Sequence, residues 1–229
     1  MKFRCERDVF VDALGTVGRA VSSRSSSPVL SGVRLSLRGD VLELTGSDLD
    51  LTISSRLEVN GIEDGQAVVP AKLATDIVRS LEPGAVAIEA VGDQAHISGG
   101  RSQFTVHLYP VEEFPPLPEP GGDPVAIAAT ELAEGLRQVV PAASGDDARP
   151  ILTGVLLSAE ADGLRLVATD SYRLAVRDLP GTSILADGQH VLIPSRALNE
   201  LTRLLTASEE VTLVLGDRDA RFDVGGTRL

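Results

Sequence analysis

The sequence predicts an α+β fold made of two copies of one module, each with two helices and a predominantly antiparallel sheet. Residues 3–57 align without a gap onto residues 125–179 at a constant offset of 122. Residues 68–81 align in the same way onto residues 192–205, at an offset of 124. A self-match of this length is typical of repeated structural units. Each copy also contains runs with strand alternation and runs with helical spacing, which together indicate a mixed fold.

In the first copy, the apolar spacing predicts each element in turn. Residues 3–5 form a short strand, and Asp8 is a candidate N-cap for the helix that follows. Residues 33–37 and 42–44 alternate around the turn residues 38–40, which predicts a hairpin. A second helix begins after Pro70, and two more strands follow it. The first helix is expected to bury one apolar face, made of Val9, Phe10, Ala13, Leu14 and Val17.

The second copy repeats this order, with Thr130 in the capping position and Pro194 before its second helix. Residues 109–125 are dense in proline and predict the connector between the copies. We therefore expect two domains, residues 1–120 and residues 121–229. The second copy ends about where the last strand of the first begins, so it is expected to lack that strand.

Composition limits the class of protein. Apolar residues make up 43% of 229 positions, which is enough for a core, but no run approaches the ~18 apolar residues of a membrane span. The charged N-terminus does not resemble a secretory signal, and Cys5 as the single cysteine excludes an internal disulfide. We expect a cytoplasmic protein. The net charge of −12 taken alone argues against general nucleic-acid binding, unless cations gather on one face.

The second helix of each copy carries such a face. On a helical wheel Lys72 and Arg79 lie together, opposite Leu73, Ala74, Ile77, Val78 and Leu81. Arg196 and Arg203 repeat the pair in the second copy. Two matching basic faces could follow a phosphate backbone. The alternative is that Asp76 and Glu200, four residues after Lys72 and Arg196, form surface ion pairs with them.

Other residues give weaker signals. Arg24 lies in a serine-rich loop, Arg137 on the polar side of a helix, and Arg149 in the loop before Pro150. The three histidines are scattered, and no phosphate-binding or nucleophile motif is present. Asp48 and Asp170 fall at equivalent turns and are expected to have structural roles. We expect a non-enzyme without catalytic residues, metal or cofactor.

Several segments resemble the bacterial replicative sliding clamp, the beta subunit of DNA polymerase III. They are MKF, SPVLSGV, LTGSDLD, VPAK, EEFPPLP and above all LVATDSYRLAV, in the family's order and near its spacings. The resemblance implies a DNA-clamp module used in tandem, a non-catalytic processivity factor, and a homodimeric ring around double-stranded DNA. It also implies three domains in each subunit, so a third is expected to be absent here.

The resemblance assigns two sets of residues. The cations expected near DNA are Arg24, Lys72, Arg79, Arg137, Arg149, Arg196 and Arg203. A pocket for client peptides is expected to involve Leu152, Thr169, Ser171, Tyr172, Arg173 and Leu174. The implied partners are the polymerase III catalytic subunit, the clamp loader and other proteins with a clamp-binding motif.

Two alternatives remain open. One is a clamp fragment that binds partners without encircling DNA. The other is a hydrolase that uses Asp170 with His190 on the tandem scaffold.

The first copy supplies an internal comparison for the peptide pocket, because Asp50 and Leu51 stand where the second copy has Tyr172 and Arg173.

Overall fold

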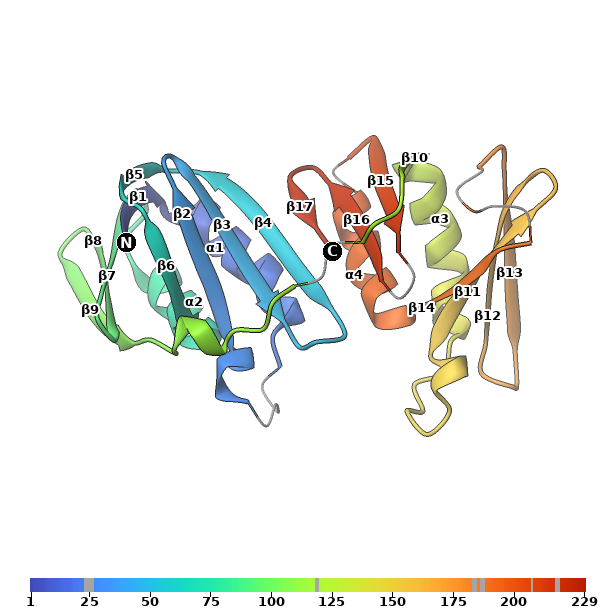
Figure 1. Ribbon diagram of the computed structural model, residues 1–229, viewed down its shortest axis with the longest axis horizontal. Helices are drawn as coiled ribbons and strands as arrows, with labels where there is room; N and C mark the ends of the chain where they lie inside the picture. Colours follow the sequence, from blue (N-terminus) through green and yellow to red (C-terminus); the bar gives the residue numbers. More distant parts are fainter. Residues whose placement is uncertain (23–26, 118–119, 183–184, 186–187, 207, 217–218) are drawn as a thin grey trace. The chain divides into compact units, whose positions relative to one another are not determined.

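The computed structural model describes residues 1–22, 27–117, 120–182, 185, 188–206, 208–216 and 219–229. It divides into two compact units (Figure 1). Unit 1 comprises residues 1–117 with residues 226–228, and unit 2 comprises residues 118–225 with Leu229. In the described part of the chain, no helix is long and apolar enough to cross a membrane.

Unit 1 contains two sheets and two α-helices. One sheet has the strand order β5-β1-β7-β8-β9, and the other continues from β4 through β3 and β2 to β6, with β17 paired to β4. The elements are β1 (Lys2–Glu6), α1 (Arg7–Val17), η1 (Gly18–Ala20), η2 (Pro28–Ser31), β2 (Gly32–Arg38), β3 (Val41–Ser47), β4 (Thr52–Glu58), β5 (Asn60–Glu63), β6 (Gly65–Pro70), α2 (Ala71–Ser80), β7 (Ala85–Val91), β8 (Gln94–Gly99), β9 (Ser102–His107), η3 (Val111–Glu113) and β17 (Thr227–Arg228).

Unit 2 repeats the plan. One sheet has the order β13-β12-β11-β14, and β10, β15 and β16 pair in sequence in another. The elements are β10 (Pro124–Ala128), α3 (Ala129–Val139), η4 (Val140–Ala142), η5 (Pro150–Leu152), β11 (Gly154–Glu160), β12 (Gly163–Thr169), β13 (Leu174–Pro180), β14 (His190–Pro194), α4 (Ser195–Leu205), β15 (Glu210–Leu215) and β16 (Ala220–Val224). All these pairings are antiparallel, so the predicted fold class is confirmed.

The helices pack their apolar faces on the sheets within each unit. In unit 1, Phe3 of β1 and Phe10 of α1 meet edge to face, with ring centroids 5.8 Å apart. In unit 2, leucines of α3 and α4 join those of β11 and β12 in one buried cluster. Aliphatic side chains therefore form most of the core, as the low aromatic content predicts.

Both predicted N-caps are wrong. Helix α1 begins at Arg7 with Glu6 at its N-cap, so Asp8 lies inside the first turn, where it pairs with Arg7. Helix α3 begins at Ala129, so Thr130 also lies inside the helix. A carboxylate in the first turn still interacts favourably with the helix dipole, which explains why the sequence suggested a cap there.

Two apolar residues predicted to be buried are also exposed. Val9 of α1 and Leu73 of α2 are each 49% exposed. The other residues of the predicted α1 face are buried. The apolar stripe is therefore narrower than the wheel suggested, because burial is confined to Phe10, Ala13, Leu14 and Val17 in α1 and to Ala71, Ala74, Ile77 and Val78 in α2.

The repeated glycines are required by close packing between strands. A Cβ at Gly32 would lie 2.6 Å from the Val68 side chain, and one at Gly154 would lie 2.9 Å from the Leu192 side chain. Both distances are shorter than a van der Waals contact. The two copies therefore keep glycine where β2 meets β6 and where β11 meets β14.

Candidate nucleic-acid and peptide interfaces

Helices α2 and α4 each present two cations on an exposed face. In α2, Lys72 and Arg79 are exposed, while Ala74, Ile77 and Val78 are buried. Neither helix has a side-chain cap, and each starts directly after a proline that ends a strand. Proline cannot donate the ladder hydrogen bond that would continue a strand, so the transition to helix occurs at the same place in both copies.

In α4 the pattern is the same. Arg196 and Arg203 are exposed, while Leu198, Leu201 and Leu205 are buried. Seven residues make nearly two helical turns, so each pair lies on one side of its helix. The two units therefore present equivalent basic pairs.

The ion-pair alternative expected Glu200 to pair with Arg196. In α4 an ion pair joins Glu200 to Arg203, whose Nη1 lies 3.4 Å from Glu200 Oε1, three residues away. Within residues 71–80, all of which are described, no ion pair joins Lys72 to Asp76. In this pair the Arg203 side chain is 62% exposed and the Glu200 side chain 14%. A helix-surface pair contributes only about 0.3–0.5 kcal/mol, so it does not prevent the exposed Arg203 from contacting a phosphate.

The other predicted cations lie in different settings. Arg137 is exposed on α3, and its Nε donates to the Ala133 carbonyl at 3.2 Å. Arg149 lies in the loop before η5, where Nε donates to Asp146 and Nη1 donates to Ser171 Oγ at 3.3 Å. Arg149 is thereby joined to a residue of the predicted peptide set. Arg24 lies outside the described residues.

The predicted peptide residues gather around the turn from β12 to β13. Asp170 Oδ1 accepts hydrogen bonds from the backbone N–H groups of Tyr172 and Arg173, both at 3.0 Å. Thr169 Oγ1 accepts from the Ser171 N–H and donates to the Arg173 carbonyl. These bonds hold Ser171 at φ 79°, a conformation that a non-glycine residue adopts only when its surroundings impose it.

The first copy has the same turn. Asp48 Oδ1 accepts from the N–H groups of Asp50 and Leu51, and Leu49 has φ 80°. The structural role predicted for Asp48 and Asp170 is therefore confirmed. The turn itself does not distinguish the copies, so any difference in function must come from the side chains it carries.

Those side chains differ strongly. Tyr172 is 93% exposed, and its equivalent in the first copy is an aspartate, Asp50. Arg173 is exposed, whereas its equivalent Leu51 is 6% exposed. Arg173 is held from both sides, because Nε lies 3.0 Å from Asp170 Oδ2 and Nη2 donates to the Pro141 carbonyl. Unit 2 thus presents an exposed aromatic ring beside a fixed guanidinium, a pairing enriched at peptide-binding hot spots.

The pKa of the Asp170 carboxyl is held below its ordinary value, first by the Tyr172 and Arg173 backbone N–H groups and then by the Arg173 side chain. A carboxyl with a lowered folded-state pKa stabilises the fold above its ordinary pKa. That contribution disappears as pH falls through the lowered value. The Tyr172 turn should therefore loosen only in strong acid.

We expect an NMR titration to give Asp170 a midpoint below the ~3.9 of an unperturbed aspartate. The Arg173→Ala variant should keep most of this shift, because backbone donors are its larger cause. A midpoint at the ordinary value in the parent chain would show that the Asp170 hydrogen bonds do not persist in solution.

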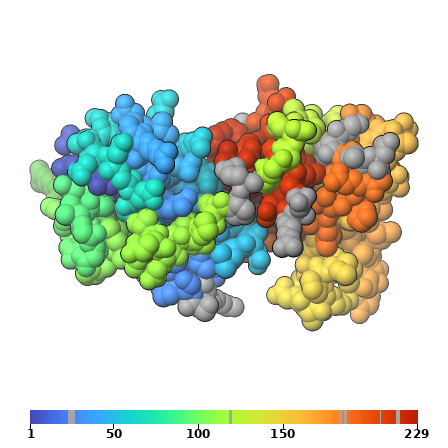
Figure 2. All heavy atoms as spheres, in the orientation of Figure 1, coloured from blue at the N-terminus to red at the C-terminus, as the bar shows by residue number. Residues whose placement is uncertain are grey.

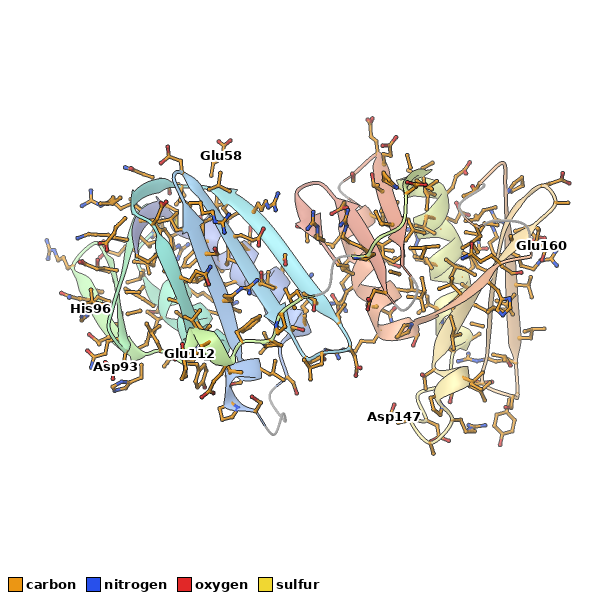
Figure 3. All side chains as sticks on the ribbon, viewed as in Figure 1. Glu58, Asp93, His96, Glu112, Asp147 and Glu160 are labelled. Atoms are coloured by element: carbon orange, nitrogen blue, oxygen red, sulfur yellow. The ribbon has the colours of Figure 1, made fainter. Side chains whose placement is uncertain are left out.

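The described residues do not assemble a catalytic pair. Both carboxylate oxygens of Asp170 accept hydrogen bonds from its own loop, and His190 lies at the start of β14. Of the other histidines, His96 hydrogen-bonds Thr105, and its label in Figure 3 lies on the β8–β9 hairpin. No group of three or more metal-binding side chains is found in the described part of the chain.

Comparison with known families agrees with the repeat. Residues 1–118 match the model of the DNA polymerase III beta subunit N-terminal domain, and residues 126–229 match the model of its central domain. The chain belongs to the DNA polymerase III beta subunit family. The predicted resemblance is thus confirmed for both copies.

Named relatives are similar over nearly the whole chain. The beta sliding clamp of Streptomyces coelicolor is 34% identical over 226 residues, covering 96% of this chain and 59% of the relative. That of Micrococcus luteus is 33% identical, covering 100% and 74%. A crystal structure of the Pseudomonas aeruginosa sliding clamp bound to griselimycin has a TM-score of 0.92 and 33% identity, covering 100% and 63%. The chain therefore spans about three fifths of the Streptomyces and Pseudomonas proteins.

Sequence reasoning missed one group of residues. Ile151 and Leu192 are exposed in unit 2, whereas their repeat equivalents Val29 and Val68 are buried in unit 1. The offsets of 122 and 124 already paired these positions, but burial cannot be read from the alignment. The difference becomes visible only when the packing of residues 109–117 on unit 1 is known.

Proposed function

We propose that this chain acts in a sliding clamp, a processivity factor that encircles duplex DNA and tethers the replicative polymerase. The observation that carries the proposal is the pair of cations repeated on the exposed faces of α2 and α4. Membership of the beta subunit family supports it. We assign DNA contacts to Lys72, Arg79, Arg196 and Arg203, and secondary contacts to Arg24, Arg137 and Arg149.

The net charge of −12 is compatible with this function. A ring is linked to DNA by topology, so it does not need a large electrostatic affinity. Affinity from phosphate contacts rises steeply with their number, and many strong contacts would slow movement along the duplex. A few cations on an otherwise acidic protein provide weak phosphate contacts that do not depend on the DNA sequence.

We further propose that the β12–β13 turn binds client peptides. Its support is the exposed Tyr172 beside the fixed Arg173, together with the lack of an equivalent in unit 1. Arg149, which we expect near DNA, also contacts this turn through its hydrogen bond to Ser171. The clients would be the polymerase III catalytic subunit, the clamp loader and other proteins with a clamp-binding motif, all in the cytoplasm.

The proposal is tested by loading the protein, as a homodimeric ring, onto nicked circular DNA with the clamp loader. A topological ring should stay with circles through high-salt gel filtration and leave after linearisation. Release from circles at high salt would refute encirclement. If the client peptide still bound in that case, the alternative of a partner-binding fragment would be favoured.

A further inference from the structure

Unit 1 contains a groove between the end of helix α1 and the start of helix α2, named here the α1–α2 groove. The two helices contact each other and lie on one face of the sheet formed by β4, β3, β2 and β6 (Figure 1). Figure 2 shows the opposite face of that sheet, where residues 109–117 lie on the surface of unit 1. The groove has a volume of about 690 Å³, within the range of about 300–1,000 Å³ that is common for small-molecule sites.

Most of the groove lining is apolar. Leu14 of α1 and Val21, shortly after η1, lie on one side, and Pro70, Ala71 and Leu73 lie on the other. Leu73 is 49% exposed, although the helical wheel placed it among the buried residues. Its apolar side chain is therefore part of a groove wall and does not belong to the core.

Two glycines of the lining keep the groove open, Gly15 within α1 and Gly18 at its C-cap. A Cβ on either glycine would meet no atom of another described segment within 4 Å, whereas one on Gly135 of α3 would lie 2.9 Å from the Leu166 side chain. Neither α1 glycine has a positive φ. Glycine inside a helix lowers stability relative to alanine. Neither packing nor backbone conformation requires these glycines, and what they provide is the open space beside them.

The second copy has larger side chains at both positions. At the offset of 122, Arg137 stands where unit 1 has Gly15, and Val140 stands where it has Gly18. Val140 is 6% exposed, and Arg137 lies along its own helix with Nε donating to the Ala133 carbonyl. The repeat therefore does not reproduce the open floor of the groove in unit 2.

The charged side chains of the lining favour an anion. Among the described residues that line the groove, Arg19 and Lys72 are positive and Asp76 is negative. Lys72 is exposed and is not paired with Asp76. It lies in the first turn of α2, which has no side-chain cap, so the positive end of the helix dipole adds to its charge.

The hydroxyl groups of the lining already have partners. Thr75 Oγ1 donates to the carbonyl four residues earlier, at 2.7 Å. Ser31 Oγ lies 2.6 Å from the Pro28 carbonyl oxygen and 3.0 Å from the Tyr109 hydroxyl. A ligand is therefore not needed to satisfy these groups. In the described lining, the Lys72 ammonium remains to meet the ionic end of a ligand.

We propose that the α1–α2 groove binds a small organic anion with an apolar body. The body lies on Gly15 and Gly18 and against the apolar walls, where it displaces water from carbon surface. The anionic group meets Lys72 at the mouth of the groove, which adds a preference for negative charge. The inference does not rest on DNA encirclement, although an occupant would share Lys72 with the proposed DNA face.

The test titrates the 229-residue chain with anilinonaphthalene sulfonate, an aromatic anion that fluoresces in apolar sites, and with uncharged phenylnaphthylamine. Gly15→Leu fills the groove with a residue that favours helix, and it should weaken binding of both probes about tenfold or more. Gly145→Leu is the matched control, because Gly145 is exposed in unit 2 and has equally open surroundings. It should leave both affinities unchanged.

Two charge changes test the preference for an anion. Lys72→Gln should weaken binding of the sulfonate about two- to fivefold, and Asp76→Asn should strengthen it by a similar factor, since each alters one exposed charge contact. Neither change should alter binding of the uncharged probe. A sulfonate affinity that is the same in the parent and in both variants would show that the groove does not select anions.

Amide NMR locates the site in the unaltered chain, so the test stays decisive if Gly15→Leu does not fold. The sulfonate should shift the signals of Gly15, Gly18 and Lys72 most. Largest shifts at the β12–β13 turn, or equal sulfonate affinity in the parent and a folded Gly15→Leu variant, would overturn the proposal. An absence of binding at millimolar sulfonate would overturn it as well.

Discussion

Reversing the four helix-face cations, as Lys72→Glu, Arg79→Glu, Arg196→Glu and Arg203→Glu together, should weaken binding of the chain to duplex DNA strongly at low salt. Each lost phosphate contact removes about 0.9 from the magnitude of the slope of log affinity against log salt, so the four should reduce that magnitude by about 3.6. Folding should survive, because exposed substitutions usually change stability by within about 0.5 kcal/mol. Anisotropy of a labelled duplex, measured over a salt series, gives both quantities.

A matched control separates position from net charge. Replacing Arg4, Arg38, Arg56 and Arg101 with glutamate changes the charge by the same amount, and all four are exposed but lie outside α2 and α4. If the proposal is right, this control variant keeps most of the slope of log DNA affinity against log salt. If both variants lost the same amount of DNA affinity, binding would depend only on the net charge of the protein, and the helix faces would have no special role.

The combined change of Tyr172→Ala and Arg173→Ala should weaken binding of a polymerase-derived peptide by about thirtyfold or more. Truncating a hot-spot residue commonly costs about 2 kcal/mol or more, which corresponds to that factor. Tyr172 is 93% exposed, so its removal leaves no cavity. Calorimetric titration measures the affinity, and thermal unfolding checks that the Arg173 contacts to Asp170 and Pro141 are not needed for folding.

The repeat supplies the control for this prediction. Asp50→Ala changes the equivalent turn in unit 1, and Asp50 is exposed. It should leave the peptide affinity unchanged. Leu51 is a poor control because it is buried, so its replacement would lower stability by removing core contacts. Equal peptide affinity in the parent and the Tyr172/Arg173 variant would place the client site elsewhere.

Much of the fold could be predicted from the sequence because the repeat gave two independent readings of each element. The alternation around Gly39 and around Asp162 predicts the hairpins β2–β3 and β11–β12, which the structure confirms. The faces of α2 and α4 follow from helical geometry, apart from the exposed Leu73. The predicted caps of α1 and α3 both lie two residues after the observed ones, because an acidic or hydroxyl side chain is favourable both at a cap and in the first turn.

The sequence by itself determined the tandem α+β plan, the family and the basic helix faces, since these depend on local periodicity and residue order. Only the tertiary structure showed that Arg149 contacts Ser171 and that Val29 is covered while Ile151 is exposed. These features depend on segments distant in sequence. Residues 109–117 bury the outer face of the unit 1 sheet, and aligned apolar residues in the two copies do not reveal which of them another segment covers.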